Sequence, residues 1–232
     1  MRVNKIYDRV TVQGEGAHAG QRCTFVRLYG CNLHCVWCDS AETWDTKALN
    51  GIAYPYRMNS RTLTPVEVAH EVRKLDVDVC VITGGEPLLQ RDELIDLAAL
   101  LDLHGIAVHV ETNGTFSPGP LVPYVEYFSV SPKLPNAQTG EPNLPVLEEF
   151  AALGWERCGF KTVVQSAAEL GEVAKLYDQV QVERRARWVM PEGITGDRIT
   201  DGLVELTEAA LALGFNVTGR QHVMLWGNER GR

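Results

Sequence analysis

The sequence predicts an α/β protein built as a partial, TIM-like barrel of about six parallel strands joined by crossover helices. Two observations support this class. Runs rich in β-branched and aromatic residues alternate with segments that carry apolar residues at helical spacing, and these units are too few to close a barrel. The 232 residues, 45% of them hydrophobic, suffice for one core. We expect one domain over residues 1–232, with a local insertion around 42–62 and a C-terminal segment, 215–232, that closes the ligand pocket.

The expected strands are short runs separated by turn or helix signals. They are Thr24–Tyr29, Val77–Ile82, Ile106–Glu111, Val125–Val130, Phe160–Val164 and Trp188–Met190. Parallel strands place ligands beyond their carboxyl ends, so the loops that follow the first four of these strands should surround one pocket.

The expected helices are recognised by their ends. Thr64 and Glu67 form a capping box with Pro65 between them, and Ser166 with Glu169 repeats the pattern before another helix. A helix over Glu93–His104 has apolar residues at helical spacing and stops at Gly105, and the last helix stops at Gly214.

Charge and hydropathy limit the possible partners. The net charge of −8 argues against a nucleic-acid-binding surface, because such surfaces concentrate Lys and Arg. The sequence shows neither a long apolar run nor an apolar N-terminal segment, so we expect a cytoplasmic protein without membrane contact. A small-molecule substrate is the better expectation.

Three of the six cysteines, Cys31, Cys35 and Cys38, lie within eight residues in a CxxxCxxC pattern. Structural zinc normally needs four ligands in two close pairs, and His34 is a poor fourth ligand because it lies inside the same tight loop. Closely spaced cysteines favour an iron–sulfur cluster. Three thiolates on a four-iron, four-sulfur cluster leave one iron open, and this spacing resembles the radical S-adenosylmethionine superfamily. Cys80, in an apolar run, is expected in the core.

Polar or glycine-rich loops follow the next three strands. The glycines after Thr83 allow a backbone to approach a ligand closely, and the segment resembles the superfamily's GGEP motif, which binds the methionyl amine. The motifs ETNG and SPK end later strands, and a lysine at such an end suits a ligand carboxylate; the resemblance assigns SPK to S-adenosylmethionine. The expected cofactor-binding residues are Gly84, Gly85, Glu86, Glu111, Asn113, Ser131, Pro132 and Lys133.

The order and spacing of the motifs resemble one family. VQGEG, FVRLYGCNLHCVWCDSAETWD, ITGGEP, ETNG, SPK and the terminal WGNERG are similar to the 7-carboxy-7-deazaguanine synthase family. The resemblance implies a lyase that turns 6-carboxy-5,6,7,8-tetrahydropterin into 7-carboxy-7-deazaguanine, with loss of ammonia, on a route to deazapurines such as queuosine. It also implies a homodimer and a one-electron reductant of the flavodoxin or ferredoxin type.

The resemblance further implies the residues that contact substrate and Mg²⁺. An amide and exposed backbone groups match the donors and acceptors of a pterin edge, and a guanidinium suits a carboxylate. The expected substrate-binding residues are Val12, Gln13, Gly14, Glu15, Arg27, Thr83 and His222. Ser40 stands where many relatives carry a metal-binding threonine, and serine keeps the hydroxyl group. Asp39 is the alternative Mg²⁺ ligand.

Two other functions remain open from the sequence. A glycyl-radical activating enzyme has the same cysteine pattern but acts on a partner protein, and VQGEG with Arg27 disfavours it. An electron-transfer module with an iron–sulfur cluster needs no organic substrate, and the intact GGEP and SPK loops argue against it.

Overall fold

The computed structural model describes residues 1–55, 59–227 and 229, and its contacts divide the chain into two compact units. Unit 1 comprises Met1–Thr11, Arg22–Thr112 and Pro118–Glu126, and unit 2 comprises Val12–Gln21, Asn113–Ser117 and Tyr127–Arg232. The short strand β2 (Thr11–Val12) spans one of the junctions in sequence. Parts of the expected insertion and of the expected C-terminal segment lie outside the described residues.

Unit 1 contains strands in the order β6-β5-β3-β1-β4. Here β3 (Arg22–Leu28), β5 (Val79–Gly84) and β6 (Ala107–Thr112) run parallel, and β1 (Arg2–Ile6) and β4 (Arg61–Thr62) are added antiparallel. In register, Arg27 lies opposite Thr83 and Leu28 opposite Gly84. The carboxyl ends of β3 and β5 are therefore neighbours.

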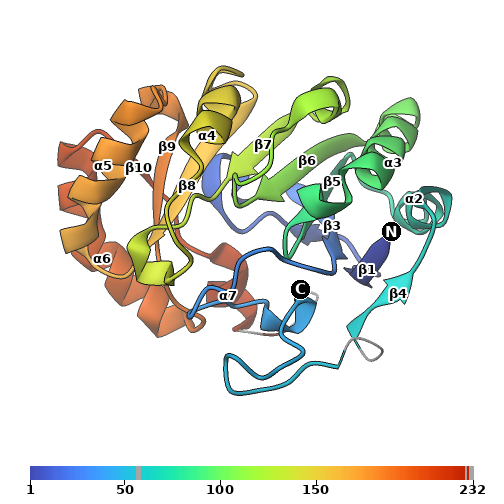
Figure 1. The fold of residues 1–232 in the computed structure, drawn as a ribbon, viewed down its shortest axis with the longest axis horizontal. Helices are drawn as coiled ribbons and strands as arrows, with labels where there is room; N and C mark the ends of the chain where they lie inside the picture. The colour runs from blue at the N-terminus through green and yellow to red at the C-terminus, as the bar shows by residue number, and fades with distance from the viewer. Residues whose placement is uncertain (56–58, 228, 230–232) are drawn as a thin grey trace. The chain divides into compact units, whose positions relative to one another are not determined.

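Helices cover the parallel strands of unit 1. The helix α2 (Pro65–Arg73) has the predicted capping box, in which the Thr64 side chain accepts from Glu67 N. It packs against α3 (Arg91–Leu103), which also contacts β6 (Figure 1). Short 3-10 helices η2 (Ala41–Thr43), η3 (Pro87–Gln90) and η4 (Gly119–Tyr124) complete the connections. Cys80 is fully buried, as predicted.

Unit 2 contains a parallel group of strands in the order β10-β9-β8-β7. These are β7 (Tyr127–Val130), β8 (Cys158–Val164), β9 (Arg187–Pro191) and β10 (Asn216–Val217). The connecting helices are α4 (Leu144–Ala151), α5 (Leu170–Gln179) and α6 (Gly196–Ala212), and α6 packs on β9, β10 and the short α7 (Gln221–Trp226) (Figure 1). The 3-10 helices are η1 (Gly16–His18), η5 (Pro135–Ala137), η6 (Ala167–Glu169) and η7 (Arg184–Ala186).

Each predicted strand overlaps an observed one, from β3 to β9, so the predicted α/β class with parallel strands is confirmed. The capping box predicted at Ser166 is wrong. Ser166 makes no side-chain cap bond, and a 3-10 turn precedes α5. The Glu169 carboxylate instead accepts from Gln165 N and Asn136 Nδ2, both at 2.8 Å, so it stabilises the preceding loop.

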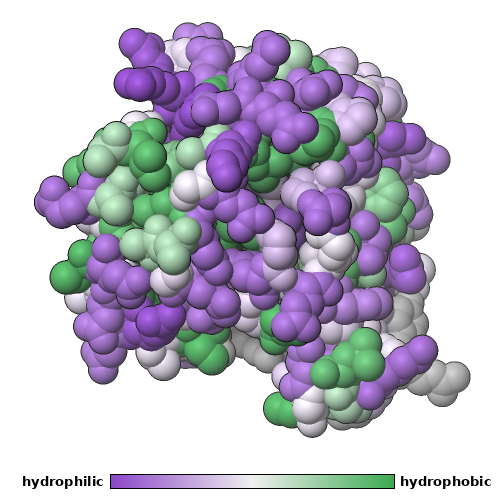
Figure 2. Space-filling model, turned by 60° about the vertical axis from the view of Figure 1, so that its left-hand side comes forward, coloured by the Kyte–Doolittle hydropathy of each residue, from purple (hydrophilic) through white to green (hydrophobic). Residues whose placement is uncertain are grey.

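Hydrophilic residues cover most of the face drawn in Figure 2, with hydrophobic residues in smaller groups between them. Among the described residues, no helix is both long enough and apolar enough to cross a membrane.

Candidate active site

In unit 1, the cysteine loop (residues 30–40) lies directly against the glycine loop (residues 84–87). Gly85 N donates to Leu28 O at 3.2 Å, and Glu86 N donates to Gly30 O at 2.8 Å. A Cβ at Gly85 would lie 2.1 Å from Gly30 O, and one at Gly84 would lie 2.2 Å from Leu28 O. Glycine is required at Gly85 because the two loops touch there through their backbones, and at Gly84 because the backbone of β3 lies against it. The contact at Gly85 joins the two predicted motifs into one structure.

The three thiols of the cysteine loop share a weakly solvated space. Burial raises the pKa of the Cys31 thiol to about 12, with smaller contributions from Glu86, Cys38 and Cys35. Leu33 N donates to Cys31 Sγ at 3.4 Å. Neutral thiols must lose their protons when a metal binds, and the metal's positive charge supplies the driving force.

Trp44 also contacts the cysteine loop, a contact that the sequence did not predict. Its indole Nε1 donates to Cys38 Sγ at 3.3 Å, and its ring packs on His34 with centroids 4.7 Å apart. Because Trp44 is largely buried, little water competes with the bond from its N–H to the sulfur. Hydrogen bonds to sulfur are among the factors that set the reduction potential of an iron–sulfur cluster.

Asp45 organises the residues that follow the cysteine loop. Its buried carboxylate accepts from the backbone amides of Lys47, Leu49 and Asn50 at 3.2, 3.0 and 2.8 Å. Asn50 Nδ2 in turn donates to Cys35 O at 3.2 Å. The turn-forming tendency of an aspartate before a short polar run could have predicted the turn, but its bond to Cys35 depends on the fold.

Glu86, predicted to bind cofactor, is fully buried and is used within the fold. Its Oε1 accepts from Leu88 N at 2.9 Å and from Thr112 Oγ1 at 2.8 Å. It therefore caps η3 and joins the glycine loop to the end of β6. Its contact with S-adenosylmethionine stays a prediction.

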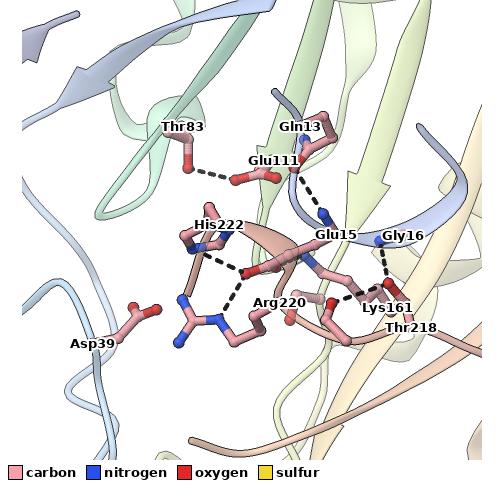
Figure 3. A network of polar contacts seen from close by, with 12 residues as sticks. Gln13, Glu15, Gly16, Asp39, Thr83, Glu111, Lys161, Thr218, Arg220 and His222 are labelled. Carbon is pink, nitrogen blue, oxygen red and sulfur yellow. Dashed lines mark hydrogen bonds and ion pairs between the residues drawn. The ribbon is translucent and has the colours of Figure 1, made fainter. Parts of the chain in front are cut away.

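The structure brings Thr83 and Glu111 together at the carboxyl ends of β5 and β6. Thr83 Oγ1 donates to Glu111 Oε2 at 2.8 Å (Figure 3). Glu111, predicted to bind the cofactor, therefore orients the hydroxyl of Thr83, which is predicted to bind the substrate.

Arg27 and Ser40 lie in the same unit as the three thiols. Burial alone would lower the pKa of Arg27, but Tyr7, Asp39 and Glu42 outweigh it and raise that pKa, so the guanidinium stays charged. Ser40 Oγ donates to Asp39 Oδ1 at 3.0 Å. The two candidate Mg²⁺ ligands are therefore adjacent.

In unit 2, the predicted substrate segment is a buried turn before η1. Gln13 N donates to Gln21 O at 2.8 Å, and Gly20 N donates to Gln13 O at 2.7 Å. The Gln13 side-chain oxygen accepts from Glu15 N at 3.1 Å, which fixes the orientation of the amide. Val12 directly precedes this turn and is half-buried.

Glu15 lies among three basic side chains of unit 2 (Figure 3). Its carboxylate pairs with Lys161 Nζ, and it accepts from Arg220 Nε at 2.8 Å. His222 Nε2 is 4.0 Å from it. Burial alone would raise the pKa of Glu15, but Lys161, Arg220 and His222 outweigh burial and hold that pKa well below its usual range.

The other predicted residues of unit 2 lie at strand ends. Lys133 Nζ donates to Ser131 Oγ at 2.7 Å just after β7, and Pro132 between them is buried. Asn113 Oδ1 accepts from Thr115 N at 3.0 Å and from Thr115 Oγ1 at 2.6 Å, which shapes the turn after β6. The predicted residues are thus divided between the two units.

Comparisons with known proteins identify the family. Residues 25–128 match the family model described as the radical SAM superfamily. Over 234 residues, the chain is 36% identical to a 7-carboxy-7-deazaguanine synthase from Pyrobaculum aerophilum, which covers 100% of this chain and 97% of the relative. The chain belongs to the 7-carboxy-7-deazaguanine synthase family. A second member, from Hyperthermus butylicus, is 34% identical over 97% of this chain and 92% of its own length.

A solved structure of a relative shows the same fold. The crystal structure of QueE from Escherichia coli is 24% identical and matches with a TM-score of 0.68, over 95% of this chain and 94% of that one. The predicted partial barrel is thereby confirmed.

Membership of this family implies a four-iron, four-sulfur cluster and S-adenosylmethionine, and the donor set fits them. Among the described residues, no three His, Cys, Asp or Glu side chains are arranged to hold a single metal ion. The ligands of a cluster of several irons lie farther apart than those of a single ion. Three thiols on one loop, close enough for Cys35 and Cys38 to raise the pKa of Cys31, suit such a cluster. Soft thiolates favour iron–sulfur clusters over hard ions such as Mg²⁺.

Proposed function

We propose that this chain is a radical S-adenosylmethionine lyase that converts 6-carboxy-5,6,7,8-tetrahydropterin into 7-carboxy-7-deazaguanine with loss of ammonia, in queuosine-type deazapurine biosynthesis. The observation that carries the proposal is the full-length likeness to a named 7-carboxy-7-deazaguanine synthase. The close backbone contact between the cysteine loop and the glycine loop supports it, because this arrangement holds the thiols beside the backbone that would receive the methionyl group.

The residues of the chain have distinct tasks in this reaction. Cys31, Cys35 and Cys38 would hold the cluster, which together with S-adenosylmethionine supplies radical initiation when both are bound. Arg27, kept charged by its neighbours, binds the substrate carboxylate, and the Thr83 hydroxyl is oriented for the pterin by Glu111.

The proposal is tested by product formation. Reduced, anaerobically reconstituted protein is incubated with S-adenosylmethionine and the carboxytetrahydropterin, and the deazapurine is detected by absorbance and mass. A product of the expected mass, absent with Cys35→Ala, supports the function. Cleavage of S-adenosylmethionine without any pterin turnover would point to a glycyl-radical activating enzyme. Cluster reduction without cleavage would point to an electron-transfer module.

Arg27→Ala tests the carboxylate contact separately. Loss of a charged hydrogen-bond partner costs about 1.5–3 kcal/mol, or roughly 10- to 150-fold in pterin affinity, while iron content and S-adenosylmethionine binding should stay. The matched control is Arg73→Ala, which removes an exposed arginine from α2. Unchanged pterin affinity in Arg27→Ala would contradict the role.

We also propose that Ser40 contributes to a Mg²⁺ site. Mg²⁺ prefers about six oxygen ligands and takes few from protein, and the bond from Ser40 Oγ to Asp39 Oδ1 supports the proposal because it gathers two hard oxygens. Ser40→Ala should raise the Mg²⁺ concentration needed for turnover with iron content unchanged, and Ser40→Thr should not. An unchanged Mg²⁺ curve for Ser40→Ala would refute it.

The remaining proposals concern the setting of the enzyme. We propose a cytoplasmic homodimer that receives electrons from a flavodoxin- or ferredoxin-type reductant. Light scattering coupled to size exclusion tests the dimer, and turnover driven by each reduced donor tests the electron source.

A further inference from the structure

Residues 13–16, called here the N-terminal turn, are bonded through three consecutive residues to the C-terminal part of unit 2. Gln221 N donates to Gly14 O at 2.8 Å. Arg220 Nε donates to Glu15 Oε1 at 2.8 Å, and Thr218 Oγ1 accepts from Gly16 N at 2.9 Å (Figure 3). The partners run in the opposite direction to the turn, so the two segments lie antiparallel. The turn carries Gln13, Gly14 and Glu15, three of the residues that the sequence predicts to contact the pterin.

The middle of these contacts is a cluster of buried charges, Glu15 with Lys161 and Arg220, called here the Glu15 ion cluster. The three side chains are only 11%, 7% and 11% exposed. Arg220 is itself held by Nη1, which donates to Gly193 O at 2.8 Å after β9. Buried ion pairs add little net stability compared with apolar packing, but the loss of one partner leaves a charge buried at high cost. Such a cluster enforces one geometry.

His222 is placed by the same contacts. A Cβ at Gly14 would lie 2.0 Å from His222 Nδ1 and 3.0 Å from His222 N, so the imidazole and its backbone rest directly on Gly14. The position of His222 therefore depends on the turn, and the turn depends on the Glu15 ion cluster.

We propose that Glu15, Lys161 and Arg220 are positioning residues for the pterin, which fix Gln13 and Gly14 against His222 before the substrate arrives. This inference rests on the proposed function and deepens it. The Glu15 carboxylate, predicted from the sequence to bind substrate, acts through its neighbours. Groups that are fixed in advance lose less conformational entropy on binding, so the Glu15 ion cluster raises affinity for the pterin.

The test separates affinity from turnover. Arg220→Ala should raise the KM and the Kd for carboxytetrahydropterin roughly tenfold or more, with kcat at saturation, iron content and S-adenosylmethionine affinity kept within about twofold. Arg220→Lys, which keeps the charge, should restore part of the affinity. Because Glu15 and Arg220 act through one contact, the double variant Glu15→Gln with Arg220→Ala should be less harmful than the two single effects combined.

Arg198→Ala is the matched control, since Arg198 is an exposed arginine of the same unit in the first turn of α6. Thr218→Val is a milder variant that removes the bond from Gly16 N without unpairing a charge, and it should raise KM by a smaller factor. It keeps the test decisive if Arg220→Ala does not fold.

The outcomes distinguish the two claims. An unchanged pterin KM in both Arg220→Ala and Thr218→Val would overturn the positioning role. So would a joint loss of iron content and kcat that Arg220→Lys does not restore, because that pattern indicates general damage. If the unaltered protein binds no carboxytetrahydropterin, the proposed function fails, and the positioning role for that substrate fails with it.

Discussion

Gly85→Ala tests the contact between the glycine loop and the cysteine loop. Ordinary contact begins at 3.4 Å, and the added carbon would lie 2.1 Å from Gly30 O, a shortfall of about 1.3 Å. It would also lie 2.9 Å from Cys31 Cβ. Because the oxygen belongs to the backbone, no side chain can rotate away. The cysteine loop must move as a whole, and the bond from Glu86 N to Gly30 O must stretch or break.

Such overpacking typically costs about 1–3 kcal/mol, which corresponds to roughly 2–12 °C in Tm for a chain of this size. Apo-protein melting followed by circular dichroism measures that loss, and iron analysis after reconstitution measures the displacement of Cys31. The matched control is Gly171→Ala in α5, where an added Cβ meets nothing within 4 Å. Gly171→Ala should keep the iron content and should not lower Tm, because alanine favours a helix more than glycine does. A Gly85→Ala protein with unchanged Tm and full iron content would refute the argument.

Other predictions address the cluster and the core. Trp44→Phe removes the N–H donor to Cys38 Sγ, a bond of about 1 kcal/mol. The reduction potential of the cluster should therefore fall by about 40 mV, which lowers the ratio of reduced to oxidised cluster at a fixed potential about fivefold. A redox titration followed by EPR measures this shift, and an unchanged potential would contradict the prediction. Burial lowers the pKa of His109 below its usual 6.5, so between the two values the unfolded chain binds more protons and stability falls as the pH falls below about 6.5. In melting curves recorded between about pH 7.5 and about pH 5, His109→Gln should lose less stability on acidification than the unaltered protein. An equal loss of stability in both proteins would count against this prediction. Cys35→Ala should abolish cluster binding while Cys80→Ala, in the buried strand β5, should spare it, and the reverse pattern of iron content would overturn the ligand assignment.

The sequence predicted the parallel strands well because each is a buried apolar run that only a covered sheet can accommodate. It missed β1 and β4, which are partly exposed and carry charged residues such as Arg2 and Arg61, so they lack an apolar pattern. The capping box at Thr64 was predicted because both of its bonds are local. The similar pattern at Ser166 failed because the Glu169 carboxylate accepts instead from Gln165 N and from Asn136, which lies in another loop.

The candidate site was also predicted only in part. The roles of the three cysteines and the two glycines could be predicted because they depend on backbone geometry within a few residues. The donor from Trp44 to Cys38, the link from Asn50 to Cys35 and the ion pair of Glu15 with Lys161 depend on how distant segments meet. No local pattern specifies such contacts.

The antiparallel contact between the N-terminal turn and the C-terminal segment also constrains how the protein is made. Glu15 and Arg220 are separated by 205 positions in the chain, and Gly16 and Thr218 by 202. During synthesis the turn leaves the ribosome well before the segment with Thr218 and Arg220 does. Contacts of such long sequence separation form late. The turn with Gln13 and Gly14 therefore stays without these partners until the segment with Thr218 and Arg220 has been made, so its assembly is a late step in folding.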